Sequence, residues 1–311
     1  MCISKSRTQY CIIDFEAFLN YDPHSVSLNI NFWFPQNDFP VKIIGSCKGF
    51  ILLFRRPDIV YIWNPSTGFK KQIPLPPLDD SESVTSLSDH FDHYDKLYGF
   101  VYDQASDDYL VVILSHVMTE PDGILVSKLK FFSIRDNRWE EIEGTNFAYF
   151  GDQEGLLFNG AIHWLAFRPD LERYVILAFD LMDRKLFEIP LPDYFHHESI
   201  MPYGLWVFGE FLGLWAKHYD STVETWVMKE YKLNSSWTKT FVLPRNSNPN
   251  LYLYFSPIFS TDNGDIIGTM RGTGLVKLND KGQQLQHCSF SNSLSDIVVY
   301  TKSLLSLPGG Q

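Results

Sequence analysis

A unit of four short apolar segments recurs five times along the chain, and this repeat constrains the fold more than any other feature. Each unit has two short strands around a tight turn, a third strand that ends in polar turn residues, and a fourth, amphipathic strand. Val, Ile, Phe, Tyr and Trp dominate the segments, while Asn, Asp, Gly and Pro separate them, which is typical of β-hairpins. The units cover residues 41–76, 97–144, 155–192, 204–244 and 254–290.

The spacing of the units matches that of propeller blades. Aligning the third segments on Phe132, Phe179, Tyr231 and Leu278 gives spacings of 47, 52 and 47 residues. The first interval, from Trp63 to Phe132, is 69 residues because it contains an insertion. Periods of about 40–50 residues are typical of β-propellers, in which neighbouring sheets cover each other's faces. We therefore predict an all-β, kelch-like β-propeller.

Strand-like segments outside the five units predict a sixth blade built from both ends of the chain. They comprise residues 10–19 and 26–32 at the start and 297–307 at the end. Pairing them in one sheet would close the ring and protect its edges. Seven blades are the alternative, if the amino-terminal strands form their own sheet. The predicted boundaries are a short remnant at 1–9, the propeller at 10–307 and a tail at 308–311.

Composition and charge exclude several classes of partner. The chain has 26 Lys and Arg against 37 Asp and Glu, a formal net charge of −11, which disfavours nucleic acid and anionic membranes. No apolar run approaches the roughly 20 residues of a membrane span, and no secretory signal is visible. The four cysteines include no CxxC pair, so we expect reduced thiols. These features predict a cytoplasmic or nuclear protein.

Signatures of catalysis and of cofactor binding are not found. The chain has no GxSxG, HExxH, GxxxxGK[ST] or strand-associated GxGxxG motif, so we predict neither an enzyme nor a cofactor. His163 stands in an apolar segment beside Trp164 and is interpreted as a hydrogen-bonded core histidine. Two clusters have metal-ligand residue types but are interpreted as solvated loops: Asp89, His90, Asp92, His93 and Asp95, and His196, His197 and Glu198.

Two further patterns have structural interpretations. Residues 260–264 resemble the start of the Asp box of sialidase-type propellers, but the Thr-Trp that should follow is absent, so we predict a hairpin turn. Tryptophans at comparable positions of the units are predicted to pack between blades. They are Trp63, Trp139, Trp164, Trp206, Trp215, Trp226 and Trp237.

The long connections predict a partner-binding face. In an up-and-down sheet of four strands, the turn after the second strand and the exit to the next blade emerge together, so one face collects 77–96, 145–154, 193–203, 245–253, 117–127 and 168–173. Binding residues concentrate on loops of a rigid scaffold, and aromatic side chains are enriched among interface anchors. We predict that these loops bind a protein through Phe91, Tyr94, Phe147, Tyr149, Phe150, Tyr194, Phe195 and Tyr252.

The insertion between the first two units adds a charge preference. Residues 77–95 contain six acids and neither Lys nor Arg, so we expect a basic patch on the partner and binding that weakens with salt. The alternative is that the loops lengthened by drift and that their aromatics fold back onto the ring. The acids are Asp79, Asp80, Glu82, Asp89, Asp92 and Asp95.

Eight segments match, in order, motifs that occur together in one protein family. They are GSCKGF from Gly45, YIWNPSTG from Tyr61, YGFVYDQASDDYLVV from Tyr98, LLFNGAIHWLAF from Leu156, AFDLMDRKLFEIPLP from Ala178, WVMKEYKLNSSWTK from Trp226, FSTDNGDIIG from Phe259 and YTKSLLSL from Tyr300. With these motifs the chain resembles the plant F-box-associated domain, type 1, of the F-box/kelch-repeat proteins, which include the S-locus F-box group. The resemblance covers residues 45–307.

The resemblance implies a propeller that recognises the substrate of an SCF-type (Skp-cullin-F-box) E3 ubiquitin ligase. In such a receptor the propeller binds the target protein, and an amino-terminal F-box binds a Skp-type adaptor. Residues 1–9 contain no Leu-Pro start and no amphipathic helix, so we expect adaptor binding only if an F-box is supplied upstream. The motifs are framework positions and carry over no binding residue. The alternative is a propeller enzyme of the copper-oxidase or glycosidase kind with a site in the central channel.

Overall fold

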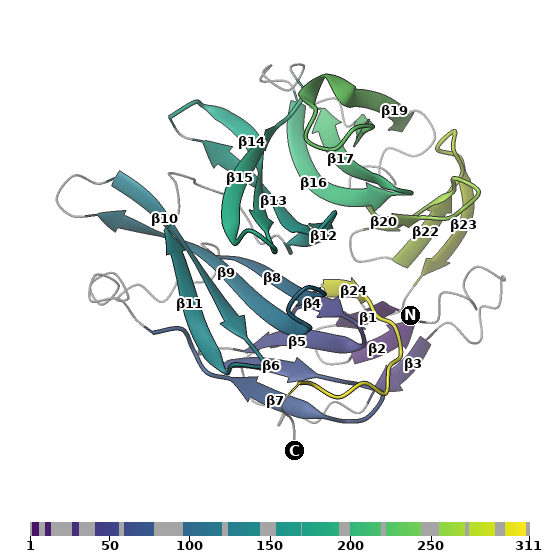
Figure 1. Cartoon of the computed structure of the whole chain (residues 1–311). Helices are drawn as coiled ribbons and strands as arrows, with labels where there is room; N and C mark the ends of the chain where they lie inside the picture. Colours follow the sequence, from purple (N-terminus) through teal and green to yellow (C-terminus); the bar gives the residue numbers. More distant parts are fainter. Residues whose placement is uncertain are drawn as a thin grey trace.

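The chain folds into six four-stranded antiparallel sheets around a common centre (Figure 1). The computed structural model describes residues 2–5, 10–13, 27–30, 41–55, 59–77, 96–119, 124–143, 154–168, 170–192, 200–218, 222–243, 255–270, 274–289 and 296–308. The predicted all-β propeller is confirmed. In the part of the chain so described, no helix has the length and apolar character needed to span a membrane.

Five of the sheets each consist of four consecutive strands, as the repeat predicts. The first two are β4 (Val41–Cys47), β5 (Phe50–Arg55), β6 (Ile59–Trp63) and β7 (Lys70–Ile73), then β8 (Lys96–Asp103), β9 (Asp108–Thr119), β10 (Ile124–Ser133) and β11 (Arg138–Glu143). The third is β12 (Leu156–Phe158), β13 (Ala161–Arg168), β14 (Arg173–Asp180) and β15 (Lys185–Pro190). The others are β16 (Ile200–Phe208), β17 (Phe211–His218), β18 (Val223–Met228) and β19 (Trp237–Leu243), then β20 (Phe255–Ser260), β21 (Ile266–Met270), β22 (Gly274–Leu278) and β23 (Gln284–Ser289).

The remaining sheet combines both ends of the chain in the order β24-β1-β2-β3. In its register Ile3 of β1 lies opposite Val298 of β24 on one side and Ile12 of β2 on the other. β24 pairs with the edge of β1, so this sheet is not made of four consecutive strands. The count of six or seven blades is therefore revised to five blades of consecutive strands and one sheet shared by the ends of the chain. The strands are β1 (Cys2–Lys5), β2 (Tyr10–Ile13), β3 (Ser27–Ile30) and β24 (Asp296–Val299).

Both ends differ in detail from the prediction. β1 lies within residues 1–9, which the sequence assigns to a remnant ahead of the propeller. At the other end, β24 ends at Val299, so the strand predicted over 297–307 is much shorter. Residues 300–307 are not in a strand, because their polar groups pair with the β6–β7 turn instead of with a neighbouring strand.

Hydrophobic cores lie between neighbouring sheets and explain the apolar runs in the sequence. The middle strands are covered on both faces, so nearly every side chain of β5 and of residues 175–179 in β14 is buried. One core joins the β4–β7 and β8–β11 sheets, and the next joins β8–β11 to β12–β15. Two more follow around the ring to the β20–β23 sheet, and another joins β24 to the β4–β7 sheet.

Tryptophans connect neighbouring sheets, as predicted. Trp164 Nε1 donates to the carbonyl oxygen of Tyr98 in the preceding sheet at 3.0 Å. Trp139 Nε1 and Trp237 Nε1 likewise donate to carbonyl oxygens at the ends of preceding outer strands, those of Pro74 at 2.8 Å and Pro190 at 3.1 Å. All seven predicted tryptophans pack in the cores between sheets.

Two predicted boundaries are wrong within the blades. Tyr231, used to align the third segments, lies beyond β18, which ends at Met228. The loop expected at 117–127 is mostly strand, since β9 continues to Thr119 and β10 starts at Ile124. Backbone pairing across this hairpin outweighs the turn-like composition of its tip, so the hairpin extends beyond the neighbouring strands (Figure 1).

Candidate partner-binding face

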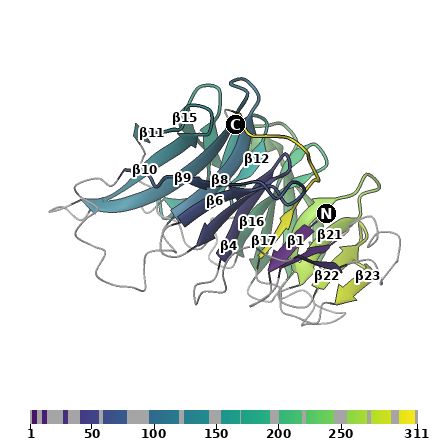
Figure 2. The same ribbon diagram turned by 90° about the horizontal axis from the view of Figure 1, so that it is seen from below.

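The strand order sorts the connections onto two faces of the propeller. We call the face with the first and third turns of each blade the turn face, and the opposite face, with the second turns and the exits, the loop face. The described tight turns include 47–50, 158–161 and 208–211. Figure 2 shows the strands from the side, with these short turns along the upper edge. The sorting of connections therefore follows the predicted scheme.

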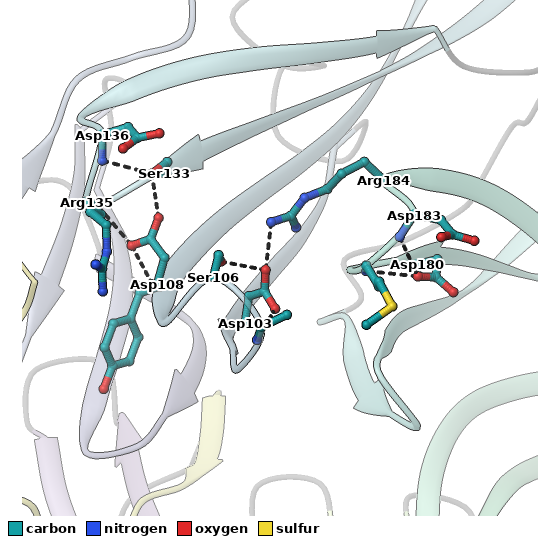
Figure 3. Close-up of polar contacts among 12 residues, drawn as sticks. Asp103, Ser106, Asp108, Ser133, Arg135, Asp136, Asp180, Asp183 and Arg184 are labelled. Atoms are coloured by element: carbon teal, nitrogen blue, oxygen red, sulfur yellow. Dashed lines mark hydrogen bonds and ion pairs between the residues drawn. The ribbon is translucent and has the colours of Figure 1, made fainter.

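Aspartates organise the tight turns of the turn face (Figure 3). Asp103 is 4% exposed, and its carboxylate accepts hydrogen bonds from the backbone N–H of Ala105 at 3.0 Å and from Ser106 Oγ at 2.6 Å. It also pairs with Arg184 Nη2 of the next blade at 2.7 Å. Because this ion pair crosses between blades, it fixes their relative position on the turn face.

The side chains predicted to bind a partner belong to the sequence segments between β7 and β8, β11 and β12, β15 and β16, and β19 and β20. All fourteen lie outside the described residues, so their role stays a prediction. The connection expected at 193–203 is shorter, because β16 already begins at Ile200. The residues concerned are Asp79, Asp80, Glu82, Asp89, Phe91, Asp92, Tyr94, Asp95, Phe147, Tyr149, Phe150, Tyr194, Phe195 and Tyr252.

The structure does describe both ends of the acidic insertion. Lys130 of β10 is only 6% exposed, and its Nζ donates to the carbonyl oxygen of Pro77 at 2.9 Å. Trp139 of β11 holds the carbonyl of Pro74 in the same exit segment. At the far end, Lys96 pairs with Ser115 in the β8–β9 ladder. The insertion thus leaves and rejoins the scaffold at points held by one blade.

An arginine–carboxylate cluster lies at the loop-face end of the β12–β15 sheet. Arg168 donates from Nε and Nη2 to the two carboxylate oxygens of Asp170, at 2.7 and 2.6 Å, and from Nη1 to Glu188. These partners raise the pKa of Arg168, and the hydrogen bonds from Arg168 lower the pKa of Asp170. Such a fork holds the β13–β14 turn in one geometry.

A second cluster surrounds Glu224 at the start of β18. Its carboxylate lies 2.7 Å from Lys239 Nζ and 3.1 Å from His218 Nε2, and it accepts from Trp226 Nε1 at 3.3 Å. Glu224 is 6% exposed, so these contacts replace the water it would otherwise bind. We interpret the cluster as an anchor for the β17–β18 turn.

The predictions made for potential metal ligands have different outcomes. His163 is confirmed as a core histidine, since it is fully buried with Nδ1 3.3 Å from the Leu156 carbonyl oxygen and Nε2 2.8 Å from Tyr231 Oη. The clusters at 89–95 and 196–198 lie outside the described residues. Within those residues, no group of three or more His, Cys, Asp and Glu side chains is placed to hold a metal ion.

The hairpin turn and the described thiols also follow the sequence interpretation. The backbone N–H of Gly264 donates to Thr261 O at 2.9 Å, and that of Thr261 donates to Asp265 O at 2.8 Å, so residues 260–264 form a tight turn. Cys47 and Cys288 are free thiols. Burial raises the pKa of Cys47 to about 11, which keeps it protonated near neutral pH.

Sequence reasoning missed the residues that hold the base of the insertion. One signal was available. The Ile-Pro-Leu-Pro ends of the first and third units, at 73–76 and 189–192, are each followed one unit later by a Trp near the start of the fourth segment. In the structure those tryptophans, Trp139 and Trp237, bind the first proline of each Ile-Pro-Leu-Pro. Lys130 gave no comparable signal, because a lysine in a strand usually faces water.

Comparison with known proteins gives a consistent result. A family model described as the F-box associated beta propeller domain matches residues 1–277. Similar curated proteins of Arabidopsis thaliana include F-box protein CPR1, 27% identical over 76% of this chain and 60% of that protein. F-box/kelch-repeat protein At3g23880 is 25% identical over 85% and 69%, and F-box protein At4g22390 is 26% identical over 73% and 58%. The chain thus spans about three fifths of CPR1 and of At4g22390.

The match and the architecture agree on one assignment. The matched residues include all strands from β1 to β21, and they fold as the blades that the family description names. Seven of the eight motifs that suggested the resemblance lie on those strands and on the turns next to them, whereas the eighth, from Tyr300, follows β24. This chain therefore belongs to the family of F-box associated beta propeller domains.

Proposed function

We propose that this propeller is the substrate-recognition domain of an SCF-type ubiquitin ligase receptor and that its loop face binds the target protein. The family membership and the F-box relatives support this proposal. The propeller itself performs no chemistry. By binding the target it raises the concentration of the target's lysines near a conjugating enzyme, in the cytoplasm or the nucleus.

The observation that carries the choice of face is the anchored base of the acidic insertion. Lys130 and Trp139 hold residues 74–77, and Lys96 begins β8, so the intervening segment starts and ends on rigid strands. Loops of this kind on a fixed scaffold are where binding residues concentrate. The turn face has short turns whose backbone N–H groups donate to the carboxylates of Asp103, Asp108 and Asp180.

The charge of the insertion defines the chemistry of the proposed target. Six acids without a basic residue, on a chain of net charge −11, favour a basic patch on the partner. The Debye length falls from about 10 Å at 0.1 M salt to about 3 Å at 1 M. Binding should therefore weaken as salt is added, and Asp79→Asn with Asp80→Asn and Glu82→Gln should reduce that salt dependence.

The test compares variants of the two faces. The loop-face variant combines Tyr94→Ala with Phe150→Ala, and the control combines Phe69→Ala with Met182→Ala, which are exposed on the turn face. Each full chain is immobilised, and proteins from an Arabidopsis extract are quantified by mass spectrometry. A target is a protein that the wild type and the control retain but the loop-face variant loses. No such protein, or loss with the control alone, would contradict the chosen face.

A second step tests the ligase role separately from the face. The chain is fused behind an F-box and combined with a Skp-type adaptor, cullin, RING subunit and ubiquitin-conjugating enzyme. The target should gain ubiquitin with the wild type and the turn-face control, and much less with the loop-face variant. If the target binds but remains unmodified, the face is supported while the ligase role is not.

A further inference from the structure

Residues 300–307, which we call the clasp, cross the turn-face end of the β4–β7 sheet (Figure 1). The clasp follows β24, so it leaves the sheet shared by the chain ends and runs over the neighbouring blade. It is the segment expected to continue the terminal strand. Its contacts are instead those of a peptide bound at a site on the β6–β7 turn.

Asn64 is the centre of this site. Its side chain is fully buried, and Nδ2 donates to the carbonyl oxygens of Ser303 at 3.0 Å and Leu305 at 3.4 Å. Its Oδ1 accepts from the backbone N–H of Ser66 at 2.9 Å, which shapes the turn. One amide therefore forms the turn with its oxygen and binds the clasp with its nitrogen.

Two further groups complete the polar contacts. Ser66 Oγ lies 2.5 Å from Tyr300 Oη and accepts from the backbone N–H of Ser303 at 3.3 Å. Gly49 lies directly beneath the clasp, since a Cβ atom added to it would lie 2.1 Å from Ser303 Cβ. The site thus depends on a residue without a side chain in the β4–β5 turn.

Apolar anchors fix the two ends of the clasp. Tyr300 is 1% exposed and packs in the core between β24 and the β4–β7 sheet, and Leu307 is 4% exposed in the core between the β4–β7 and β8–β11 sheets. Between the anchors, Leu304 and Leu305 are 84% and 52% exposed. The clasp therefore contacts the blade through backbone groups of residues 303–305 and through the side chains of Tyr300 and Leu307.

We propose that blade β4–β7 has a binding site for an extended peptide, filled in this chain by the clasp, and that the clasp is a separable second closure of the propeller. It connects the shared sheet to two further blades without using the β1–β24 ladder. The ligand class is an extended segment with Tyr and, seven positions later, Leu, whose intervening carbonyls bind Asn64. A peptide of this sequence should therefore occupy the site in trans.

The first test displaces the clasp within the full chain. Gly49→Ala places a methyl group against Ser303, and Gly160→Ala is the matched control. Both glycines have positive φ, +86° and +75°, in the first turn of a blade, but nothing lies within 4 Å of a Cβ at Gly160. Hydrogen exchange of 301–307 should accelerate by about tenfold or more in Gly49→Ala and remain near the wild-type rate in Gly160→Ala. Equal rates in the two variants would overturn the proposal.

The second test supplies the clasp in trans. A fluorescein-labelled peptide of residues 298–309 is titrated against the wild-type chain and against Leu307→Ala, whose own anchor is weakened. Fluorescence anisotropy should show at least about tenfold tighter binding to folded Leu307→Ala, and adding Gly49→Ala should abolish that binding. A peptide carrying Leu307→Ala should not bind. Absence of binding to the folded Leu307→Ala chain would overturn the proposal, and near-ultraviolet circular dichroism verifies that fold.

Discussion

The Nε2 atom of His163 lies 2.8 Å from Oη of Tyr231, across the boundary between the β12–β15 and β16–β19 sheets. The other ring nitrogen, Nδ1, faces the carbonyl oxygen of Leu156, which can only accept. Nδ1 therefore carries the proton, and Nε2 accepts from the tyrosine hydroxyl. Burial lowers the pKa of His163 to about 4 and raises that of Tyr231, so both side chains stay neutral near pH 7.

This pair predicts a loss of stability in weak acid. The unfolded chain binds a proton at His163 below about pH 6.5, whereas the folded chain binds it only near pH 4. The contribution of His163 to the free energy of unfolding is therefore complete above about pH 6.5. It falls by at most about 3 kcal/mol as the pH drops to 4. Urea unfolding from pH 7 to pH 4 should show a flatter profile for His163→Gln than for the wild type. The exposed His287→Gln is the control and should retain the wild-type slope.

The tryptophan bridges between blades predict a position-dependent effect of the indole N–H. Replacing Trp139 or Trp237 by benzothienylalanine exchanges the N–H for sulfur at similar shape and removes one hydrogen bond. Each replacement should lower the free energy of unfolding by about 1 kcal/mol. Trp206 is the control, because its buried Nε1 has no acceptor among the residues described. The same replacement there should leave stability unchanged or raise it, and an equal loss at all three sites would contradict the assigned role.

The ion pair between Arg184 and Asp103 predicts a cost that an exposed pair lacks. Arg184→Met leaves the Asp103 carboxylate, with a side chain 5% exposed, without its cation, which should cost about 2 kcal/mol. Arg138→Met removes ion pairs with Glu140 and Asp136, whose side chains are 42% and 52% exposed, and should change stability by less than about 0.5 kcal/mol. Adding Asp103→Asn to Arg184→Met should recover part of the loss. Chemical denaturation of the wild type, the two single variants and the double variant measures these differences in the free energy of unfolding.

Inner-strand glycines predict opposite effects of the same substitution. Gly204 lies at a β-bulge of β16 and Gly45 at a β-bulge of β4, and each strand is the first, inner strand of its blade. A Cβ at Gly204 would lie 2.6 Å from Trp215 Nε1, whereas at Gly45 the nearest atom is 3.9 Å away. Gly204→Ala should therefore destabilise the fold by about 1–3 kcal/mol, and Gly45→Ala should be neutral or stabilising by up to about 1 kcal/mol. Similar losses in thermal unfolding would show that the space beside Trp215 is not limiting.

The sequence predicts most of the propeller because its strands have clear local signals. The segment from Phe50 to Phe54 and the run 175–179 are apolar without alternation, as strands covered on both faces require. Asn159 and Gly160 both have positive φ, as the tight hairpin predicted there requires. These features depend on neighbours within a few residues, so one sequence suffices to find them.

The errors occur where distant contacts override the local pattern. Tyr231 continues the apolar pattern of β18, so the sequence predicts it as part of that strand. In the structure β18 ends at Met228, and the Tyr231 hydroxyl contacts His163 of another blade. Residues 300–307 have the composition of a strand. Their carbonyl groups at Ser303 and Leu305 instead accept hydrogen bonds from Asn64, more than 230 positions earlier in the sequence. The buried Lys130 donates a hydrogen bond to the carbonyl oxygen of Pro77 in the neighbouring blade and pairs with Glu141 of β11. No periodicity within a segment reports such partners.

The partner-binding residues were predicted from connection lengths and composition alone. All fourteen lie outside the described residues, so the structure tests the scaffold and not the side chains. The anchored ends at Pro77 and Lys96 are compatible with the proposed face. Binding measurements with the two face variants are the direct test.

The pairing of β1 with β24 also has a consequence for synthesis of the chain. Ile3 and Val298 meet in one ladder, but ribosomes add only about 5–20 residues per second, so Val298 emerges roughly 15–60 s after Ile3. During that interval the edge of β1 has no native partner and is open to pairing with strands of other nascent chains. Pairing between nascent chains on one polysome is therefore a hazard of the interval before residue 296 is made, when chaperones that shield strand edges would protect β1.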